Sequence, residues 1–128
     1  MPQLTDLPDI DPLAIWEGVR ARAVEGERIT LAVVELDADA VVPEHRHPNE
    51  QMGIMLRGSG RFRVGDEVRD VGPGSTWRIL ADVPHELTVG PDGAVVIDVF
   101  SPPRVDWRGT PIAEPRPLVW PAGHDDAV

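Results

Sequence analysis

Residues 45–51 have the sequence HRHPNEQ, and the spacing of ligand-type side chains in this stretch decides the interpretation of the chain. His45 and His47 are two residues apart, so on an extended strand their imidazoles point to the same side. Gln51 follows at the start of the next apolar stretch, and His85 begins a later one. Imidazole is the commonest side-chain ligand for transition metals. The pattern therefore predicts one metal site formed by His45, His47, Gln51 and His85.

The predicted ligands are all neutral, which bears on the choice of metal. Three imidazoles and one amide oxygen suit a borderline divalent ion such as Ni(II), Fe(II), Zn(II), Mn(II) or Cu(II). Neutral ligands leave such an ion its double positive charge, so that it can act as a Lewis acid. The alternative is that these are ordinary polar residues on a surface loop.

Short apolar stretches separated by glycine and proline run through the chain, which contains 12 glycines and 14 prolines. This is typical of an all-β protein with many turns. Alternating or β-branched segments predict strands over residues 29–36, 51–56, 61–64, 67–71, 76–80, 85–89 and 94–100. Strands at this spacing predict a sandwich or a small barrel.

The two ends of the chain differ from its middle. Asp11 and Pro12 predict a single short helix, with Pro12 at its first position and apolar residues after it up to Trp16. Beyond the last predicted strand, six prolines exclude a regular helix or a central strand. We expect an extended tail over the domain, anchored by Trp107 and Trp120, with loose final residues that include His124. The predicted parts are an N-terminal arm (1–27), a barrel (28–106) and a proline-rich tail (107–128).

Composition limits the classes of function. A chain of 128 residues fits one domain with its own core. Cysteine is absent, so disulfides, thiolate ligands and thiol nucleophiles are excluded, and a cytoplasmic location is expected. The net charge of −10 disfavours nucleic acid as a partner. We see no secretory signal pattern and no apolar run long enough for a membrane helix, so no membrane partner is expected. The expected partner is a small-molecule substrate.

A carboxylate interrupts the last predicted strand, residues 94–100. Val96, Asp98 and Phe100 share one face of this strand, and the alternate residues would pack outside the barrel. Burial of an unpaired carboxylate is costly, so Asp98 needs a partner or a function, and a general acid or base is the natural role. Arg104 follows two prolines and could hold a substrate carboxylate by two parallel hydrogen bonds. Alternatively, Asp98 and Arg104 pair with each other at the barrel rim.

The residues around the first two histidines resemble the first motif of the cupin family. That motif has two histidines in the pattern HxH, then a glutamate and, after six intervening residues, a glycine. His45, His47 and Gly58 fall in place, and Gln51 takes the glutamate position. Glu50 is next to it, but adjacent residues on a strand face opposite sides and only Gln51 keeps the interval to the glycine. We therefore expect Gln51 as the fourth ligand.

The region around His85 is similar to the second cupin motif. Pro73-Gly74 precedes this histidine, although the glycine comes one place early and Val89 stands where an asparagine is usual. The resemblance covers roughly residues 28–106. It implies a double-stranded β-helix, the jelly-roll barrel of the cupins, with a metal ion inside the mouth. It also implies a homodimer.

Residues 98–107 closely resemble the end of the cupin enzymes that linearise unsaturated uronates released from pectin and alginate. In that family an aspartate, a phenylalanine and an arginine near the last strand are needed for activity, and they match Asp98, Phe100 and Arg104. The metal of that family is held by three histidines and a glutamine. The resemblance implies an isomerase- or lyase-type enzyme that converts a 4,5-unsaturated uronate into its open-chain keto form. Asp98 would move the proton, Arg104 would grip the carboxylate and Phe100 would shape the pocket.

Other functions share the same residues. The segment also resembles cupins that guide cyclisation in aromatic polyketide pathways, which should have a larger and more apolar cavity. A third reading is an iron-dependent dioxygenase, which must consume oxygen. A fourth is a non-catalytic small-molecule binder, in which Asp98 would be out of reach of the metal. Trp77 could either line the cavity or brace the barrel.

Overall fold

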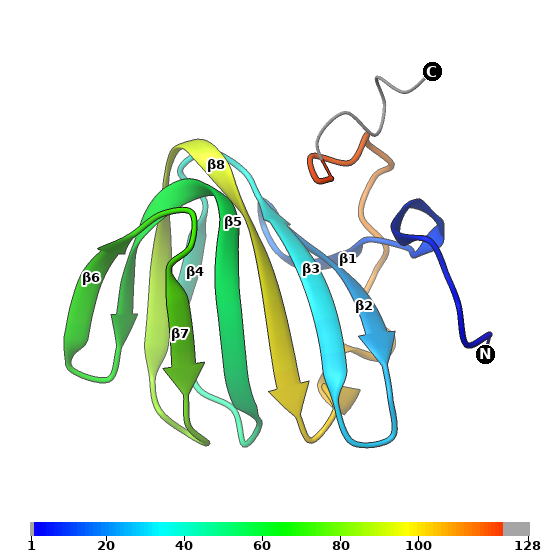
Figure 1. The fold of residues 1–128 in the computed structure, drawn as a ribbon, viewed down its shortest axis with the longest axis horizontal. Coiled ribbons are helices and arrows are strands. Elements are labelled where there is room, and N and C mark those ends of the chain that lie inside the picture. Colours follow the sequence, from blue (N-terminus) through cyan, green and yellow to red (C-terminus); the bar gives the residue numbers. More distant parts are fainter. Residues whose placement is uncertain (1, 122–128) are drawn as a thin grey trace.

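The computed structural model describes residues 2–121 and shows a curved arrangement of antiparallel strands (Figure 1). In this part of the chain the strands are β1 (Leu13–Trp16), β2 (Val19–Glu25), β3 (Thr30–Leu36), β4 (Val41–His45), β5 (Glu50–Val64), β6 (Glu67–Val71), β7 (Thr76–Ile79) and β8 (His85–Ser101). Two short 3-10 turns are η1 (Leu7–Asp9) and η2 (Val105–Trp107). No helix in residues 2–121 is long and apolar enough to cross a membrane. The predicted all-β class is confirmed.

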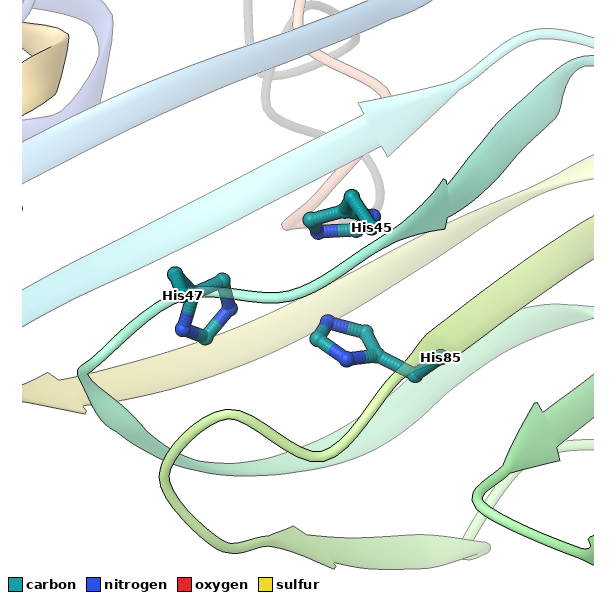
Figure 2. Close-up of side chains that lie close together, drawn as sticks. All are labelled: His45, His47 and His85. Carbon is teal, nitrogen blue, oxygen red and sulfur yellow. The ribbon is translucent and has the colours of Figure 1, made fainter.

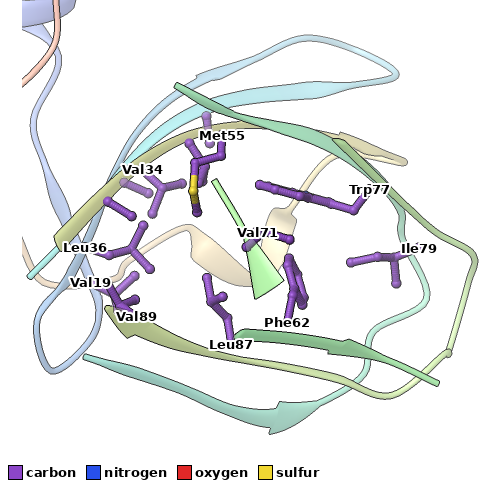
Figure 3. Packing of buried hydrophobic residues seen from close by; sticks show 14 of the residues in the cluster. Val19, Val34, Leu36, Met55, Phe62, Val71, Trp77, Ile79, Leu87 and Val89 are labelled. Carbon is purple, nitrogen blue, oxygen red and sulfur yellow. The ribbon is translucent and has the colours of Figure 1, made fainter. Parts of the chain in front are cut away.

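The two longest strands, β5 and β8, organise the fold. The hydrogen-bonded order is β1-β2-β3-β8-β5-β6, with β4 also paired to β8 and β7 also paired to β5. The second half of β8 pairs with β3 and the first half of β5, whereas its first half pairs with β4 and the second half of β5. Because both long strands change partners along their length, the sheet curves and surrounds a core, as in a jelly roll (Figure 3).

Glycine explains why β5 is continuous where the sequence predicts two strands, 51–56 and 61–64. Bulges interrupt its pairing with β8 between Met55 and Arg57 and again at Gly58. Gly58 has a φ of +88°, and a Cβ there would lie 2.0 Å from a backbone carbonyl oxygen, so glycine is required. Bulges let a strand bend without ending. In the same way β8 joins the predicted strands 85–89 and 94–100.

The short helix predicted after Asp11 is wrong, because the apolar residues that follow it form β1. Leu13 pairs with Ala21 of β2, and the turn between the two strands contains Gly18 with a φ of +74°. Glycine adopts this left-handed conformation without strain. Four residues are too few to display a helical period, and strand pairing decides their conformation. Strands β1 and β2 thus extend the sheet into the residues predicted as an N-terminal arm.

The core fills the space enclosed by the strands (Figure 3). Alternate residues of β3, β5 and β8 point inward, as the period of two predicts. They include Val34, Met55, Phe62, Leu87 and Val96, all buried. The remaining residues of these strands point away from the core.

The segment after η2 runs back over the first strand. The amide of Ala14 donates to the carbonyl of Pro111 at 2.8 Å, and the amide of Ala113 donates to Pro12 at 2.7 Å. Further on, the amide of Val119 donates to the Glu35 carboxylate at 2.8 Å. The described part of the predicted tail therefore contacts β1 and β3. His124 and the other final residues of that tail lie outside the described residues.

Candidate metal centre and active site

Three histidines come together beside the start of β8 (Figure 2). His45 ends β4 and His85 begins β8, and the two are direct partners in the ladder between these strands. His47 lies in the loop after β4, where its carbonyl accepts a hydrogen bond from the amide of Asp82 at 2.9 Å. One ring nitrogen from each histidine lies within 4.8 Å of the others. The structure thus brings together three of the four residues predicted as metal ligands.

The backbone orients all three imidazole rings in the same way. Each Nδ1 lies within hydrogen-bond distance of a carbonyl oxygen two residues away: Pro43 for His45 (2.8 Å), Asn49 for His47 (3.0 Å) and Val83 for His85 (2.9 Å). A donor proton on Nδ1 leaves the Nε2 lone pair free, which is how metal-binding histidines are usually held. The Nε2 atom of His85 is buried without a hydrogen-bond partner in the described residues. This donor set fits a divalent ion.

Burial keeps the cluster in its neutral form. Desolvation lowers the pKa of His85 to about 4 and also lowers the pKa values of His45 and His47. The positive charge of Arg104 lowers all three further. At neutral pH the imidazoles therefore carry lone pairs, and no proton competes with a metal ion for them.

Gln51 connects the histidines to the predicted acid or base. Its side chain is buried at the start of β5, and its Oε1 lies 3.1 Å from Nε2 of His47. Its side chain also makes a hydrogen bond to the Asp98 carboxylate, which lowers the pKa of that group. Glu50, the alternative ligand, is exposed. Of the two neighbours, only Gln51 faces the histidines.

Asp98 is a buried carboxylate held by a tryptophan. Nε1 of Trp77 donates to its Oδ1 at 2.8 Å, so Trp77, whose place the sequence leaves open, lies in the site. Burial raises the pKa of Asp98 to about 6, against the hydrogen bonds from Trp77 and Gln51 and the charge of Arg104. Gly53 leaves the space for this contact, because a Cβ there would lie 2.2 Å from both bonded atoms. The site therefore holds a carboxylate that can lose and regain a proton near neutral pH.

Arg104 is held by η2 and not by Asp98. Its Nε and Nη2 atoms donate to the two carboxylate oxygens of Asp106 at 3.1 and 2.9 Å. Its guanidinium carbon lies 4.7 Å from the ring centre of Phe100 and 4.5 Å from that of Trp107. No ion pair joins Asp98 to Arg104 within residues 2–121. The alternative of a closed Asp98–Arg104 pair is therefore wrong.

Most of these groups, but not His47 or Asp106, line one cavity of about 60 Å³. The chain has four tryptophans, two phenylalanines and no tyrosine, and five of these six aromatic residues line the cavity. Its polar lining consists of His45, His85, Gln51, Asp98 and Arg104. Polar groups thus converge on one part of a largely apolar space, which is typical of a small-molecule site.

Sequence reasoning missed three residues of this region. Trp16 of β1 lies 4.7 Å from the His45 ring and lines the cavity, but its segment was expected to be helical. Asp106 was not considered, although it lies two residues after Arg104. Asn49 donates to the carbonyl oxygens of Pro102 and Pro103 at 2.5 and 3.3 Å, which ties the histidine loop to the segment before η2. Only its place between His47 and Gln51 could have drawn attention to it.

A family model described as "Cupin domain" matches residues 32–100, which is more than half of the chain. The matched range contains the three clustered histidines, Gln51, Asp98 and Phe100. No curated protein matches the chain.

Solved structures with the same fold come from several bacteria. KdgF from Halomonas sp. is 22% identical with a TM-score of 0.75, over 83% of this chain and 98% of that one. An RmlC-like cupin from Shewanella frigidimarina is 19% identical with a TM-score of 0.77, over 84% and 96%. The polyketide cyclase RemF from Streptomyces resistomycificus is 22% identical with a TM-score of 0.69, over 80% of each chain. At these identities the likeness shows a shared fold.

Proposed function

The chain belongs to the cupin family, and from this premise we propose that it is a metal-dependent enzyme that opens a 4,5-unsaturated uronate ring to the linear keto form. One observation carries the proposal: Asp98, a buried carboxylate with a pKa raised to about 6, shares one cavity with His45, His85 and Arg104. A proton carrier, a neutral ligand set and a cationic group are the parts that this isomerisation needs.

The metal of the proposed enzyme would be one divalent transition ion. His45, His47, His85 and Gln51 would hold it, as the unpaired Nε2 of His85 and the common orientation of the rings support. When bound, such an ion supplies Lewis-acid polarisation of substrate oxygens. Nickel, iron, zinc, manganese and copper all suit this ligand set.

Asp98 is the proposed proton carrier. Its carboxylate takes the proton from the C1 hydroxyl of the sugar, the bond from C1 to the ring oxygen breaks, and C1 becomes an aldehyde. The ring oxygen keeps the electron pair of the broken bond, so that this oxygen, C5 and C4 form an enolate, which takes a proton at C4 and becomes the C5 ketone. The proton that leaves O1 is the one that C4 gains, so the reaction is an isomerisation without water or an oxidant. A pKa of about 6 allows both halves of this transfer near neutral pH.

Arg104 and Phe100 are the proposed binding residues. Asp106 uses the Nε and Nη2 side of the guanidinium, which leaves its Nη1 end for a substrate carboxylate. Phe100 lines the cavity between this guanidinium and the His47 ring, 5.7 Å from the latter. The substrate carboxylate would thus be fixed at a short distance from the proton carrier.

The test is a direct assay with metal-loaded protein. We expect the ultraviolet absorbance of unsaturated galacturonate to fall, and Asp98→Asn to reduce kcat by about 10²–10⁴-fold with metal content unchanged. Asp70→Asn, an exposed carboxylate on β6 that pairs with Arg61, is the matched control and should keep full activity. Full turnover by Asp98→Asn would remove the assigned role, and no turnover by the unmodified protein would reject the substrate.

A second candidate function is cyclisation of an aromatic polyketone, the class of activity named for RemF. The aromatic and apolar lining of the cavity is the observation that favours it. Turnover of a polyketone model compound, with none of the unsaturated uronate, would select this candidate.

We also propose that the protein forms a homodimer through the outward side of β3, β5 and β8. Leu31, Val99 and Met52 form one row across these strands, and Ile97 and Ile54 lie in the next. Leu31, Met52 and Ile54 remain exposed. The residues of both rows on β3, β5 and β8 are uncharged, whereas the net charge of −10 makes other surfaces of two copies repel each other. A second copy of this face would cover it.

The oligomeric state tests the proposed interface. Met52→Lys should convert the dimer to a monomer in analytical ultracentrifugation, because it buries a charge at the centre of the contact. Val68→Lys, an equally exposed apolar residue on β6, should remain dimeric. A dimeric Met52→Lys protein, or a monomeric unmodified one, would exclude this interface.

A further inference from the structure

We infer that Asp106 and Trp107 are positioning residues that aim the guanidinium of Arg104 and make the cavity selective for a carboxylate. The inference rests on the proposed function in that it names the group by which the substrate is recognised. Both residues belong to η2, directly after Arg104. Neither belongs to the set of residues expected from the sequence to act on the substrate.

Asp106 fixes the direction of the guanidinium. A planar guanidinium has two edges that can meet a carboxylate in parallel. Asp106 occupies the edge formed by Nε and Nη2, with one carboxylate oxygen on each. The other edge, formed by Nη1 and the second proton of Nη2, has no hydrogen-bond partner in residues 2–121. This is therefore the edge that remains for a ligand carboxylate.

Trp107 fixes the plane of the same group. The guanidinium carbon lies 4.5 Å from the centre of the Trp107 ring and 4.7 Å from that of Phe100, and the two rings are 5.2 Å apart at an angle of 73°. Arg104 is buried, so these cation–π contacts replace the water that it loses. With rings beside it and Asp106 at one edge, the guanidinium cannot swing out of the cavity.

The backbone at Arg104 is fixed independently of η2. The amide of Arg104 donates to the hydroxyl of buried Thr30 at 3.0 Å, and Asn49 holds the two preceding carbonyl groups. Changes at Asp106 or Trp107 should therefore alter the aim of the side chain and leave the position of its Cα. This separates a positioning role from a general structural one.

The Asp106 carboxylate also alters what the arginine can select. The ion pair has no net charge, so it offers two directed donors and little long-range attraction for anions. A planar carboxylate matches two parallel donors, whereas an ester or an amide of the same acid satisfies them poorly and leaves a buried donor unpaired. The cavity should thus prefer an acid over its neutral ester because of geometry.

Binding of an unreactive pair of probes tests this without turnover. We would titrate Ni(II)-loaded protein with galacturonate and with its methyl ester, and follow the fluorescence of the tryptophans that line the cavity. The unmodified protein should prefer the acid by about tenfold or more. Asp106→Asn and Trp107→Leu should lose most of this preference by weaker binding of the acid alone, whereas Trp107→Phe, which retains an aromatic face, should keep it.

The outcomes separate this inference from the proposed function. Equal preference for the acid in the unmodified protein, Asp106→Asn and Trp107→Leu would overturn the positioning role, as would no preference in the unmodified protein. Loss of preference in both variants, together with no turnover of unsaturated galacturonate, would reject the proposed reaction and retain the inference. If the uronate is turned over, Asp106→Asn should raise KM by about tenfold with a smaller change in kcat. Circular dichroism shows whether each variant is folded. If Trp107→Leu does not fold, the comparison of Asp106→Asn and Trp107→Phe with the unmodified protein still decides the test.

Discussion

Two sets of largely buried polar side chains lie on opposite faces of the same sheet, and they differ in how their charges are compensated. The inner set lines the cavity region and consists of His45, His47, Gln51, His85, Asp98 and Arg104. The outer cluster lies on the other side of β2 and β3 and consists of Arg20, Arg22 and Glu35, all buried. Alternation places them there, because the neighbouring residues Val19, Ala21 and Val34 line the cavity.

The charged groups of the outer cluster neutralise one another, although Nε of Arg20, Nε of Arg22 and Oε1 of Glu35 have no hydrogen-bond partner in residues 2–121. Glu35 lies 3.6 Å from Arg20 and 3.7 Å from Arg22, and its remaining contact is the backbone amide of Val119. Arg20 also pairs with Asp37 at 3.0 Å. Opposite charges are thus paired inside the protein, and none of these three residues lines the cavity of the inner set. Burial of this kind holds the C-terminal segment on the sheet.

The inner set stays open. One ring nitrogen of each imidazole lies within 4.8 Å of the others. Asp98 keeps a pKa raised to about 6, because its hydrogen-bond donors do not compensate for burial. Unmatched groups of this kind lower stability and are retained where a ligand completes them. Unfilled hydrogen-bonding capacity therefore occurs in both sets. The inner set is distinguished by the cavity that it lines and by Asp98, which has no ion-pair partner in residues 2–121, whereas Glu35 lies between two arginines.

The largest expected effect is in the outer cluster. Glu35→Ala leaves two arginines buried without their carboxylate and should lower the free energy of unfolding by about 3–5 kcal/mol. Chemical denaturation measures it, and turnover per folded molecule should not change. Glu35→Gln, which keeps an acceptor for the amide of Val119, should lose less. A similar stability for Glu35→Ala and the unmodified protein would mean that the cluster is solvated and not matched.

In the inner set, removal of a charged group should have the opposite effect at high pH and raise the free energy of unfolding. The folded protein holds the Asp98 proton more tightly than the unfolded chain, because burial raises its pKa from an ordinary 3.8 to about 6. The cost of ionising Asp98 is therefore absent below pH 4, grows between pH 4 and 6 and is complete above that range, where it reaches about 3 kcal/mol. Asp98→Asn should thus stabilise the metal-free protein at pH 8 but not at pH 4. Thermal unfolding at both pH values checks this, and a pH-independent difference would contradict it.

A bound metal ion should stabilise the folded protein through the inner set and not through the outer cluster. Ni(II) or Zn(II) at a hundred times its dissociation constant should stabilise the folded protein by about 2.7 kcal/mol. His85→Ala should abolish this gain, whereas Glu35→Gln in the outer cluster should retain it. Unfolding curves with and without metal give both numbers. An equal gain in His85→Ala would show that the metal binds elsewhere.

The chemistry of the inner set could be predicted from the sequence, but its contacts could not. His45 and His47 are two apart on a strand, and Asp98 interrupts an apolar one, so one-dimensional spacing reveals them. The partners of these residues come from elsewhere in the chain: Trp77 reaches Asp98 from β7, and Trp16 reaches His45 from β1. No local pattern encodes which tryptophan meets which carboxylate, because strand register and curvature decide it.

For the fold as well, local sequence patterns predicted some features, and the pairing of strands decided others. Period-two alternation predicted the strands of the barrel, since their inward faces bury apolar residues. It failed at β1, where four apolar residues after Pro12 have no period of their own and the sheet selects their conformation. It also divided β5 and β8, because glycines that look like turns occupy bulges in continuous strands.

The smallest substitution, Gly53→Ala, adds one methyl group next to the Trp77–Asp98 hydrogen bond. In Gly53→Ala the Cβ would lie 2.2 Å from both Asp98 Oδ1 and Trp77 Nε1, so that hydrogen bond must break or β5 must shift. We expect a loss of about 1–3 kcal/mol from overpacking, and a kcat well below that of the unmodified enzyme. Gly60→Ala is the matched control on the same strand, because its Cβ would meet a methyl group of Leu87 at 2.8 Å. Leu87 lines the same cavity but takes no part in the Trp77–Asp98 hydrogen bond. It should cost comparable stability and leave kcat unchanged. If both variants lose equal activity, the Trp77–Asp98 contact is ordinary packing; if only Gly53→Ala does, the uncompensated Asp98 carboxylate of the inner set, as Trp77 holds it, is the source of the chemistry.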